Sequence, residues 1–419
     1  MYKTLIVLLL LFYTISFSFN AKSEEYFSNK YNLSFVDNNY VEILKDGDSI
    51  LSKYLEIIEK AESFIYIETF IFHGDEFGEI FAESLIKKAR EGLDIILIYD
   101  IFGSFPNATL DNNFYENLEK EGIKLIKYHD FLEKGLSEIK DSWHRKTIIV
   151  DNKYAFIGGT NLNNHVYKRK KDFLSFFGGS LEANIDTTIF LRGPVVYEMY
   201  RDYISFLKYN EVELAKIYNK NNECFEDGIK ASVISFHIDM KKEEEILENI
   251  FIDLIENSEK EILMQMGYFI PTQKIIKALI SAVERGLEVK ILISCKEISN
   301  MPWRVEVSKY IYKKLIDNGV KIYTHNFNPV HSKIAIFDNV FSVVGTVNLD
   351  RRSMFLDSES MILFNSGKFS ERLKEWFYEG ISNSSLLNLD SVENIGVVKL
   401  LYNSSIEIYT FFIKLLALK

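Results

Sequence analysis

The pattern of apolar and polar positions after residue 32 alternates between two periods. Short apolar runs predict strands, and longer amphipathic stretches predict helices. In the first part of the chain the strands are expected at 40–44, 63–72 and 93–99, and the helices at 49–61 and 79–90. Gly92 follows the second of these helices and is expected to end it. Strands and helices that alternate at this spacing predict an α/β fold, with sheets flanked by helices.

The same pattern returns in the second half of the chain. Residues 87–95 read KKAREGLDI and 281–289 read SAVERGLEV; residues 121–124 read EGIK and 318–321 read NGVK. Two such echoes in the same order predict an internal repeat rather than two unrelated domains. A polar stretch separates the copies. We therefore expect a first domain at 32–209, a linker at 210–228 and a second domain at 229–419.

Each half contains one copy of the motif H-x-K-x4-D-x6-G-x-x-N. The first copy consists of His144, Lys146, Asp151, Gly158 and Asn161, and the second of His331, Lys333, Asp338, Gly345 and Asn348. A single copy would often be a surface strand with a solvated lysine. Two copies with the same full spacing, inside a repeated framework, argue strongly for a shared function.

The residues around each motif predict a β-hairpin. The segment from the histidine to the residue before the aspartate is β-branched and apolar, so we expect a strand in which His144 and Lys146 point to one face. Asp151 then begins a tight turn, a position that favours structural support over proton transfer. The glycines after the next strand are expected to allow a bend that brings Asn161 back toward the histidine.

These two motifs resemble the phosphodiesterase motif of the phospholipase D superfamily, whose members build one active site from two copies. The resemblance implies that one histidine attacks phosphorus and forms a phosphohistidine, while the other protonates the leaving group and later deprotonates the acceptor. The lysines and asparagines would stabilise the developing charge, each donor contributing on the order of 3 kcal/mol. On this pattern the enzyme needs no metal and no other cofactor.

Further blocks are similar to the bacterial cardiolipin synthase family, and this resemblance covers nearly all of the chain after residue 32. The blocks are Ile67–Phe72 with Asp75 and Gly78, Leu97–Ser104, Gly267–Pro271 and Asn348–Ser353. The resemblance implies two phospholipase D-like domains with one active site at their interface. In one departure, Gly159 stands in the first copy where the second has Thr346, so one hydroxyl is missing from that half.

The family pattern also implies acidic residues that accept a hydrogen bond from the catalytic imidazoles. Glu359 opens a strand at the family position, and Asp186 precedes similar strand text in the first half. Asp172 competes with Asp186, because its distance from His144 equals that of Glu359 from His331. We favour Asp186, since an extra loop at 163–179 explains the offset. Such a carboxylate would fix the imidazole tautomer and favour its protonated form.

Composition and charge limit the classes of binding partner that the sequence predicts. The chain has 419 residues, of which 47% are hydrophobic and 26% charged, as in ordinary globular proteins. Its formal net charge of −11 argues against a general nucleic-acid binder, which usually has a basic surface. The substrate class implied by the resemblance is therefore a phospholipid rather than a nucleic acid.

The ends of the chain and one basic loop bear on membrane contact. Residues 1–21 are apolar after Lys3, and we favour a signal peptide over a short uncleaved anchor. Either would take the enzyme to the bacterial cell membrane or, after export, to its outer side. Lys168–Lys171 is expected to be a solvated face, with contact to anionic lipid headgroups as the alternative. The apolar tail 406–418 is expected to be a packed helix, with interfacial binding as its alternative.

The expected reaction, carried over from the family, joins two phosphatidylglycerol molecules. His144 would take the phosphatidyl group and release glycerol with His331 as the acid, and the hydroxyl of a second phosphatidylglycerol would then attack to give cardiolipin. Because the two copies are nearly symmetric, the sequence does not decide which histidine attacks. A hydrolase acting on phospholipid or nucleic acid is the nearest alternative, and an inactive membrane scaffold is a third.

Overall fold

The computed structural model describes residues 24–104, 112–128, 141–167, 182–214, 216–221, 223–236, 245–295, 299 and 302–388. The N-terminal segment 1–21, the basic loop 168–171, Asp172 and the apolar tail 406–418 all lie outside these ranges. Among the helices within them, none is both long and apolar enough to span a membrane.

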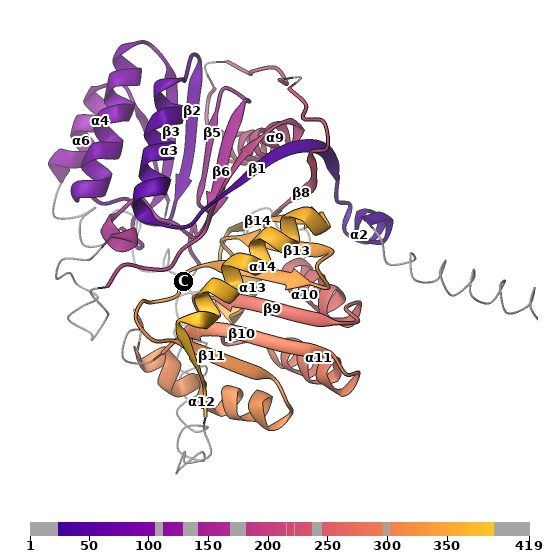
Figure 1. Ribbon diagram of the computed structural model, residues 1–419. Coiled ribbons are helices and arrows are strands. Elements are labelled where there is room, and N and C mark those ends of the chain that lie inside the picture. Colours follow the sequence, from indigo (N-terminus) through magenta and orange to yellow (C-terminus); the bar gives the residue numbers. More distant parts are fainter. Residues whose placement is uncertain are drawn as a thin grey trace, which may run out of the picture.

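In these ranges, fifteen strands form one mixed sheet (Figure 1). Its two halves meet where β1 (Val36–Leu44) pairs antiparallel with β8 (Ile229–Phe236). Outward from this junction, the first half has the order β1-β7-β6-β5-β2-β3-β4 and the second β8-β14-β13-β12-β9-β10-β11, followed by β15. The two orders match strand for strand, so both halves have the same topology. This agrees with the α/β fold of two similar halves that the sequence predicts.

The strand bounds follow. In the first half they are β2 (Phe64–Thr69), β3 (Asp94–Asp100), β4 (Lys124–Tyr128), β5 (Thr147–Val150), β6 (Tyr154–Gly158) and β7 (Thr188–Arg192). In the second half they are β9 (Glu261–Met266), β10 (Glu288–Ser294), β11 (Lys321–His325), β12 (Lys333–Phe337), β13 (Phe341–Gly345), β14 (Glu359–Asn365) and β15 (Ser384–Leu386).

Helices cover the sheet in both halves. They are α2 (Glu24–Tyr31), α3 (Gly47–Glu59), α4 (Glu76–Arg90), α6 (Asn112–Lys120), α9 (Pro194–Tyr209), α10 (Ile246–Glu256), α11 (Gln273–Glu284), α12 (Pro302–Asp317), α13 (Arg351–Phe355) and α14 (Gly367–Ser382), with a short 3-10 turn at Asn164–Val166. The local sequence explains where some of these helices begin. Asp46 and Ser49 form a capping box at α3, and Asp75 caps α4 by accepting from the Gly78 amide.

The glycines at matching positions of the two repeated sequence segments have the same backbone conformation. Gly92 and Gly286 have φ of +93° and +94°, and Gly122 and Gly319 have φ of +91° and +88°. Each follows the end of a helix, where a residue with a side chain would be strained. The repeated text therefore marks the same helix ends in both halves.

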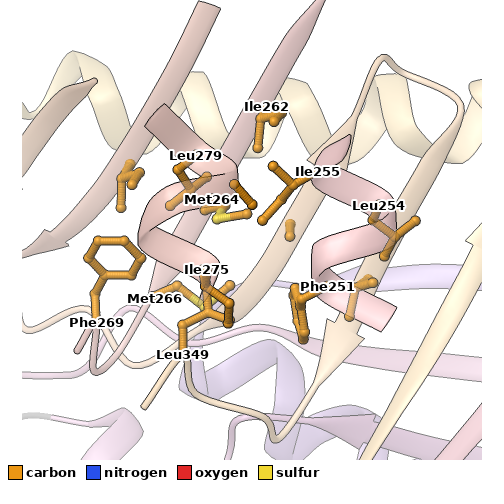
Figure 2. Packing of buried hydrophobic residues seen from close by; sticks show 14 of the residues in the cluster. Phe251, Leu254, Ile255, Ile262, Met264, Met266, Phe269, Ile275, Leu279 and Leu349 are labelled. Carbon is orange, nitrogen blue, oxygen red and sulfur yellow. The ribbon is translucent and has the colours of Figure 1, made fainter. Parts of the chain in front are cut away.

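Three clusters of buried apolar side chains pack the helices against the sheet. One packs α10 and α11 on the second half, and Figure 2 shows Phe251 and Ile255 of α10 on the side toward Met264 and Met266 of β9. A similar cluster packs α3 and α4 on the first half. The third contains α9, α14 and residues of both halves, so the two halves share one core.

The helix α2 precedes the expected start of the first domain but packs on the second half. Its Tyr31 hydroxyl donates to the Asp253 carboxylate at 2.5 Å, and Lys30 lies 2.7 Å from the same group. The first described residues are thus fastened to α10. The described part of the polar stretch 210–228 contains neither helix nor strand, and β8 begins directly after it.

Each motif forms the expected hairpin, with one difference. Asp151 and Asn152 both have φ of +55°, and the amide of Lys153 donates to Val150 O at 2.9 Å, as in a type I′ turn. However, β5 begins only at Thr147, because the residues before it pair with the other half. The chain bends at Gly159, directly after β6, as expected, and Gly158 also allows close packing, since a Cβ there would lie 2.1 Å from Thr187 O.

Candidate active site

The two motif histidines come from different halves, and both are buried, with exposed fractions of 8% for His144 and 9% for His331. Each is held by backbone contacts to the opposite half. The amide of His144 donates to Ser358 O at 2.9 Å, and that of His331 donates to Ile185 O at 2.8 Å. Because Ser358 and Ile185 each precede an acidic residue, this pairing also brings a carboxylate to each imidazole.

The carboxylates cross between the halves. Nδ1 of His144 lies 2.9 Å from Oε1 of Glu359, and Nδ1 of His331 lies 2.8 Å from Oδ2 of Asp186. Both acidic residues are almost completely buried. With Nδ1 engaged, the imidazole nitrogen left for chemistry is Nε2 in each case.

The two motif lysines are buried beside the histidines. Nζ of Lys146 donates to the backbone oxygen of His144 at 2.6 Å, and Nζ of Lys333 donates to that of His331. Burial lowers the pKa of Lys146 to about 7 and that of Lys333 to about 8. Two ammonium groups confined in a buried site would be stabilised by a bound anion.

The motif asparagines are fixed through their side-chain oxygens. Oδ1 of Asn161 accepts from the amide of Ile71 at 3.2 Å, and Oδ1 of Asn348 accepts from the amide of Tyr268 at 3.2 Å. Both side chains are buried. Their amino groups are therefore oriented, which suits them to donate hydrogen bonds to an anion.

Burial sets the protonation of the histidines. It lowers the pKa of His144 well below the usual value, and the charges of Lys146 and Lys333 lower it further. Burial and Lys333 lower the pKa of His331 to about 4, although Asp186 opposes this. Both shifts favour the neutral imidazole. A bound phosphodiester would raise both values by adding negative charge.

The two carboxylates differ in their surroundings. Burial raises the pKa of Glu359 well above its usual value, and Thr346 donates to its Oε2. Burial would also raise the pKa of Asp186, but the interactions with His331 and Lys333 outweigh it, so the pKa is lowered. A Cβ on Gly159 would lie 2.1 Å from Asp186 Oδ1. Asp186 therefore fills the space that a threonine side chain at this position, as in the second half, would need.

The family model described as the phospholipase D-like domain of cardiolipin synthase matches residues 54–187 and 251–381. The chain belongs to this family. It is an enzyme of the phospholipase D superfamily, and the resemblance that the motifs carry is confirmed. The two matched segments include both histidines, both lysines, both asparagines, Asp186 and Glu359.

Curated relatives agree with this membership. A cardiolipin synthase of Clostridium perfringens is 26% identical over 91% of this chain and 78% of its own length. Cardiolipin synthase B of Salmonella typhi is 24% identical over 81% of this chain and 79% of its own length. A crystal structure of phosphatidylserine synthase from Haemophilus influenzae has the same fold, with a TM-score of 0.66, 15% identity and coverage of 93% of this chain and 99% of that one.

The motif aspartates occupy another place in this family fold. Asp151 Oδ1 accepts from the amides of Ser63 and Phe64, and its Oδ2 from that of Glu62 at 2.7 Å. Asp338 makes the same contacts to residues 259–261. Both carboxylates fasten their hairpin to the start of the neighbouring strand and do not bond to the histidines. This geometry fits the structural role that their turn position suggests.

Two further polar residues position the site and were quoted in the sequence only as parts of family-like blocks. The Asp100 carboxylate accepts from the amide of Trp143 at 2.7 Å, directly before His144. Arg352 donates to Asp357 at 2.7 Å and to the Ser142 hydroxyl at 2.8 Å, which ties the two halves together. Their position in the family-like blocks indicated that these residues matter. Their hydrogen-bond partners are far away in the sequence, so only the fold shows what they contact.

Proposed function

We propose that this enzyme is a membrane-associated phosphatidyltransferase that makes cardiolipin from two phosphatidylglycerol molecules through a phosphohistidine, releasing glycerol. The observation that carries this proposal is the crossed arrangement of His144 with Glu359 and His331 with Asp186, flanked by two buried lysines. The family membership and the relatives named cardiolipin synthase support the choice of reaction.

In the first step, Nε2 of one histidine attacks the phosphorus of the donor lipid. Its Nδ1 proton is held by the crossed carboxylate, which keeps the lone pair on Nε2. The bond from phosphorus to the glycerol oxygen breaks, and the other imidazole, protonated in the presence of the bound anion, gives its proton to that oxygen. Lys146, Lys333, Asn161 and Asn348 stabilise the charge on the non-bridging oxygens.

In the second step, a hydroxyl of the acceptor lipid attacks the phosphohistidine. The second imidazole takes the hydroxyl proton, and the bond from nitrogen to phosphorus breaks, which restores both histidines. We assign His144 as the nucleophile and His331 as the acid and base. The ring of Phe70 lies 5.1 Å from that of His144 and gives this histidine an apolar neighbour.

Lipid product analysis tests the reaction. Purified protein is incubated with phosphatidylglycerol in mixed micelles, beside the variants His144→Ala and His331→Ala, and products are resolved by mass spectrometry. Cardiolipin and free glycerol are expected with the native enzyme and with neither variant. Phosphatidic acid alone would make the enzyme a hydrolase, and substantial activity in either variant would rule out the two-histidine mechanism.

A second measurement tests the assignment of roles. The native enzyme is incubated with phosphorus-labelled phosphatidylglycerol, quenched at alkaline pH, which preserves phosphohistidine, and digested for peptide mapping. Label is expected on the peptide that contains His144. Label on the peptide that contains His331 would exchange the two roles.

A further inference from the structure

Arg145 lies between the histidine and the lysine of the first motif, and its guanidinium is buried. Its side chain is only 2% exposed. Nε of Arg145 lies 3.2 Å from Oε1 of Glu68 on β2, and Nη2 makes an ion pair with Asp202 on α9. The side chain of Glu68 is completely buried. The guanidinium therefore joins two acidic residues in the interior of the first half.

The Glu68 carboxylate contacts two side chains of the motif, one on each side of Lys146. Its Oε1 faces Arg145, and its Oε2 accepts a hydrogen bond from the Thr147 hydroxyl. Because side chains alternate along an extended chain, Arg145 and Thr147 point away from the face that carries His144 and Lys146. Fixing the first pair on one side of the chain therefore fixes the direction of the second pair on the other side.

Arg145 also precedes the paired part of its strand. The strand β5 begins at Thr147, whereas its counterpart β12 begins at Lys333, and the amide of Gly267 donates to Ser332 O at 2.9 Å. In the second half, backbone pairing thus reaches the residue directly after the histidine. In the first half, the side chain of Arg145 supplies contacts at the point where the strand pairing has not yet begun.

The same place in the second half is neutral. Gln265 is the fifth residue of β9, as Glu68 is of β2, and Ser332 follows its histidine as Arg145 does. Nε2 of Gln265 donates to the Ser332 hydroxyl at 3.0 Å. A buried ion pair costs more desolvation than such a neutral pair, and burial raises the pKa of Glu68 to about 7 in spite of Arg145. Since neutral groups fill this place in one half, packing alone does not require the charges in the other.

The charged network continues into the second half of the molecule. Oδ2 of Asp202 accepts from the Ser235 hydroxyl at 2.9 Å, and Ser235 lies on β8. There Ser235 pairs with Ser360 of β14, the residue directly after Glu359. The contacts from Arg145 therefore lead to the strand that supplies the carboxylate for His144.

We propose that Arg145 is a positioning residue which, held between Glu68 and Asp202, fixes His144 and Lys146 relative to Glu359. This inference rests on the proposed function in taking His144 and Lys146 as catalytic groups, and adds a residue that acts on them from the side opposite the substrate. A guanidinium suits this place, because it stays charged when buried and its planar fork can bind two carboxylates. Accurate placement matters, since a displacement of about 1 Å can lower a rate about 10²-fold.

The test separates positioning from stability in the full-length enzyme. Arg145→Met removes the charge and leaves two carboxylates without it, so its Tm should fall. A neutral variant combines Glu68→Gln, Arg145→Ser and Asp202→Asn, which copies the neutral pair of the second half and leaves no buried charge unpaired. Its Tm should stay close to the native value. Lys313→Met, which removes a cation that pairs with Asp317 on α12, is the control.

Cardiolipin formation from phosphatidylglycerol is measured well below each Tm. In Arg145→Met and in the neutral variant, we expect kcat to fall roughly 10²-fold while KM stays within about threefold, because the substrate still binds but the reacting groups are displaced. Arg145→Lys should recover part of the loss, since an ammonium can pair with the same carboxylates. Lys313→Met should match the native enzyme.

Two outcomes would overturn the positioning role alone: native kcat in the neutral variant, or no recovery in Arg145→Lys. Either would leave the buried charges a purely structural feature. Substantial activity in His144→Ala would instead overturn the proposed two-histidine mechanism, and the positioning role with it.

Discussion

Nδ1 of His144 lies 2.9 Å from Oε1 of Glu359, a residue 215 positions further along the chain. His331 and Asp186 make the reciprocal contact from the other half. Neither half can therefore orient its own histidine, even though each contains a full copy of the motif. Both histidine–carboxylate pairs therefore require both halves, which β1 and β8 join into one sheet.

Replacing Glu359 by Gln should lower kcat by roughly 10²- to 10⁴-fold while KM changes little, because the neutral amide cannot hold the Nδ1 proton and stabilise the imidazolium as the carboxylate does. The pH profile gives a second readout. Since the pKa of Glu359 is raised, the carboxylate form is lost as pH falls through that raised value, and native activity should fall with it. The variant should lack this acid limb.

Glu371→Gln is the matched control for that profile. Glu371 is exposed, and its carboxylate accepts a hydrogen bond from Asn339. Its kcat and pH dependence should equal those of the native enzyme. An unchanged acid limb in Glu359→Gln would show that the carboxylate does not set the protonation of His144.

Gly159 and Asp186 should behave as one unit. A Cβ at Gly159 would meet Asp186 Oδ1 at 2.1 Å, so Gly159→Thr should displace the carboxylate from His331 and lower kcat at least tenfold. Adding Asp186→Glu copies the Thr346 and Glu359 arrangement of the other half. Steady-state kinetics should then show partial recovery. If the double variant is no more active than Gly159→Thr, the two positions are independent.

Asp151→Asn should affect stability rather than chemistry. The carboxylate accepts from three backbone amides, and the variant would direct an amino group at one of them, which costs about 1–3 kcal/mol. Thermal unfolding should show a lower Tm, while kcat measured well below Tm stays within about threefold of the native value. Asp37→Asn, on an exposed side chain, is the control.

Asp338→Asn should behave in the same way as Asp151→Asn, because its contacts are the same. A large loss of kcat in either variant without a change in Tm would instead assign the motif aspartates to proton transfer.

The local sequence predicted much of this structure. The helix expected at 79–90 appears as Glu76–Arg90, and the strand expected at 93–99 as Asp94–Asp100. Gly92 and Gly286, paired by sequence alone, share a φ near +93°. These features depend on residues a few positions apart, whose periodicity and capping are visible in the chain itself.

The parts that depend on distant contacts could not be predicted. The strand expected from His144 begins at Thr147, because the amide of His144 pairs with Ser358 instead. The motifs supplied the proposed site residues, but spacing along the chain does not say which carboxylate meets which imidazole. The sequence shows that the first copy has Gly159 where the second has a threonine, but only the packing of Gly159 against Asp186 explains why.

Anion binding should be coupled to proton uptake. In the empty site the pKa of Lys146 is about 7 and that of Lys333 about 8, and a bound anion raises both. A group whose pKa rises on binding takes up a proton at any pH between its free and bound values. Affinity for sulfate, which does not titrate in this range, should therefore weaken as pH rises from 7 to 9, by up to about tenfold per pH unit for each proton taken up.

Isothermal titration calorimetry at pH 8 measures this uptake, because the observed heat then depends on the ionisation enthalpy of the buffer. Lys146→Met should remove part of the buffer dependence and weaken binding, whereas Lys313→Met should leave both unchanged. Heat that is independent of the buffer would mean that the lysines are fully protonated in the empty site. The low pKa values would then have no part in selecting an anionic substrate, and burial of the lysines would serve only to position them.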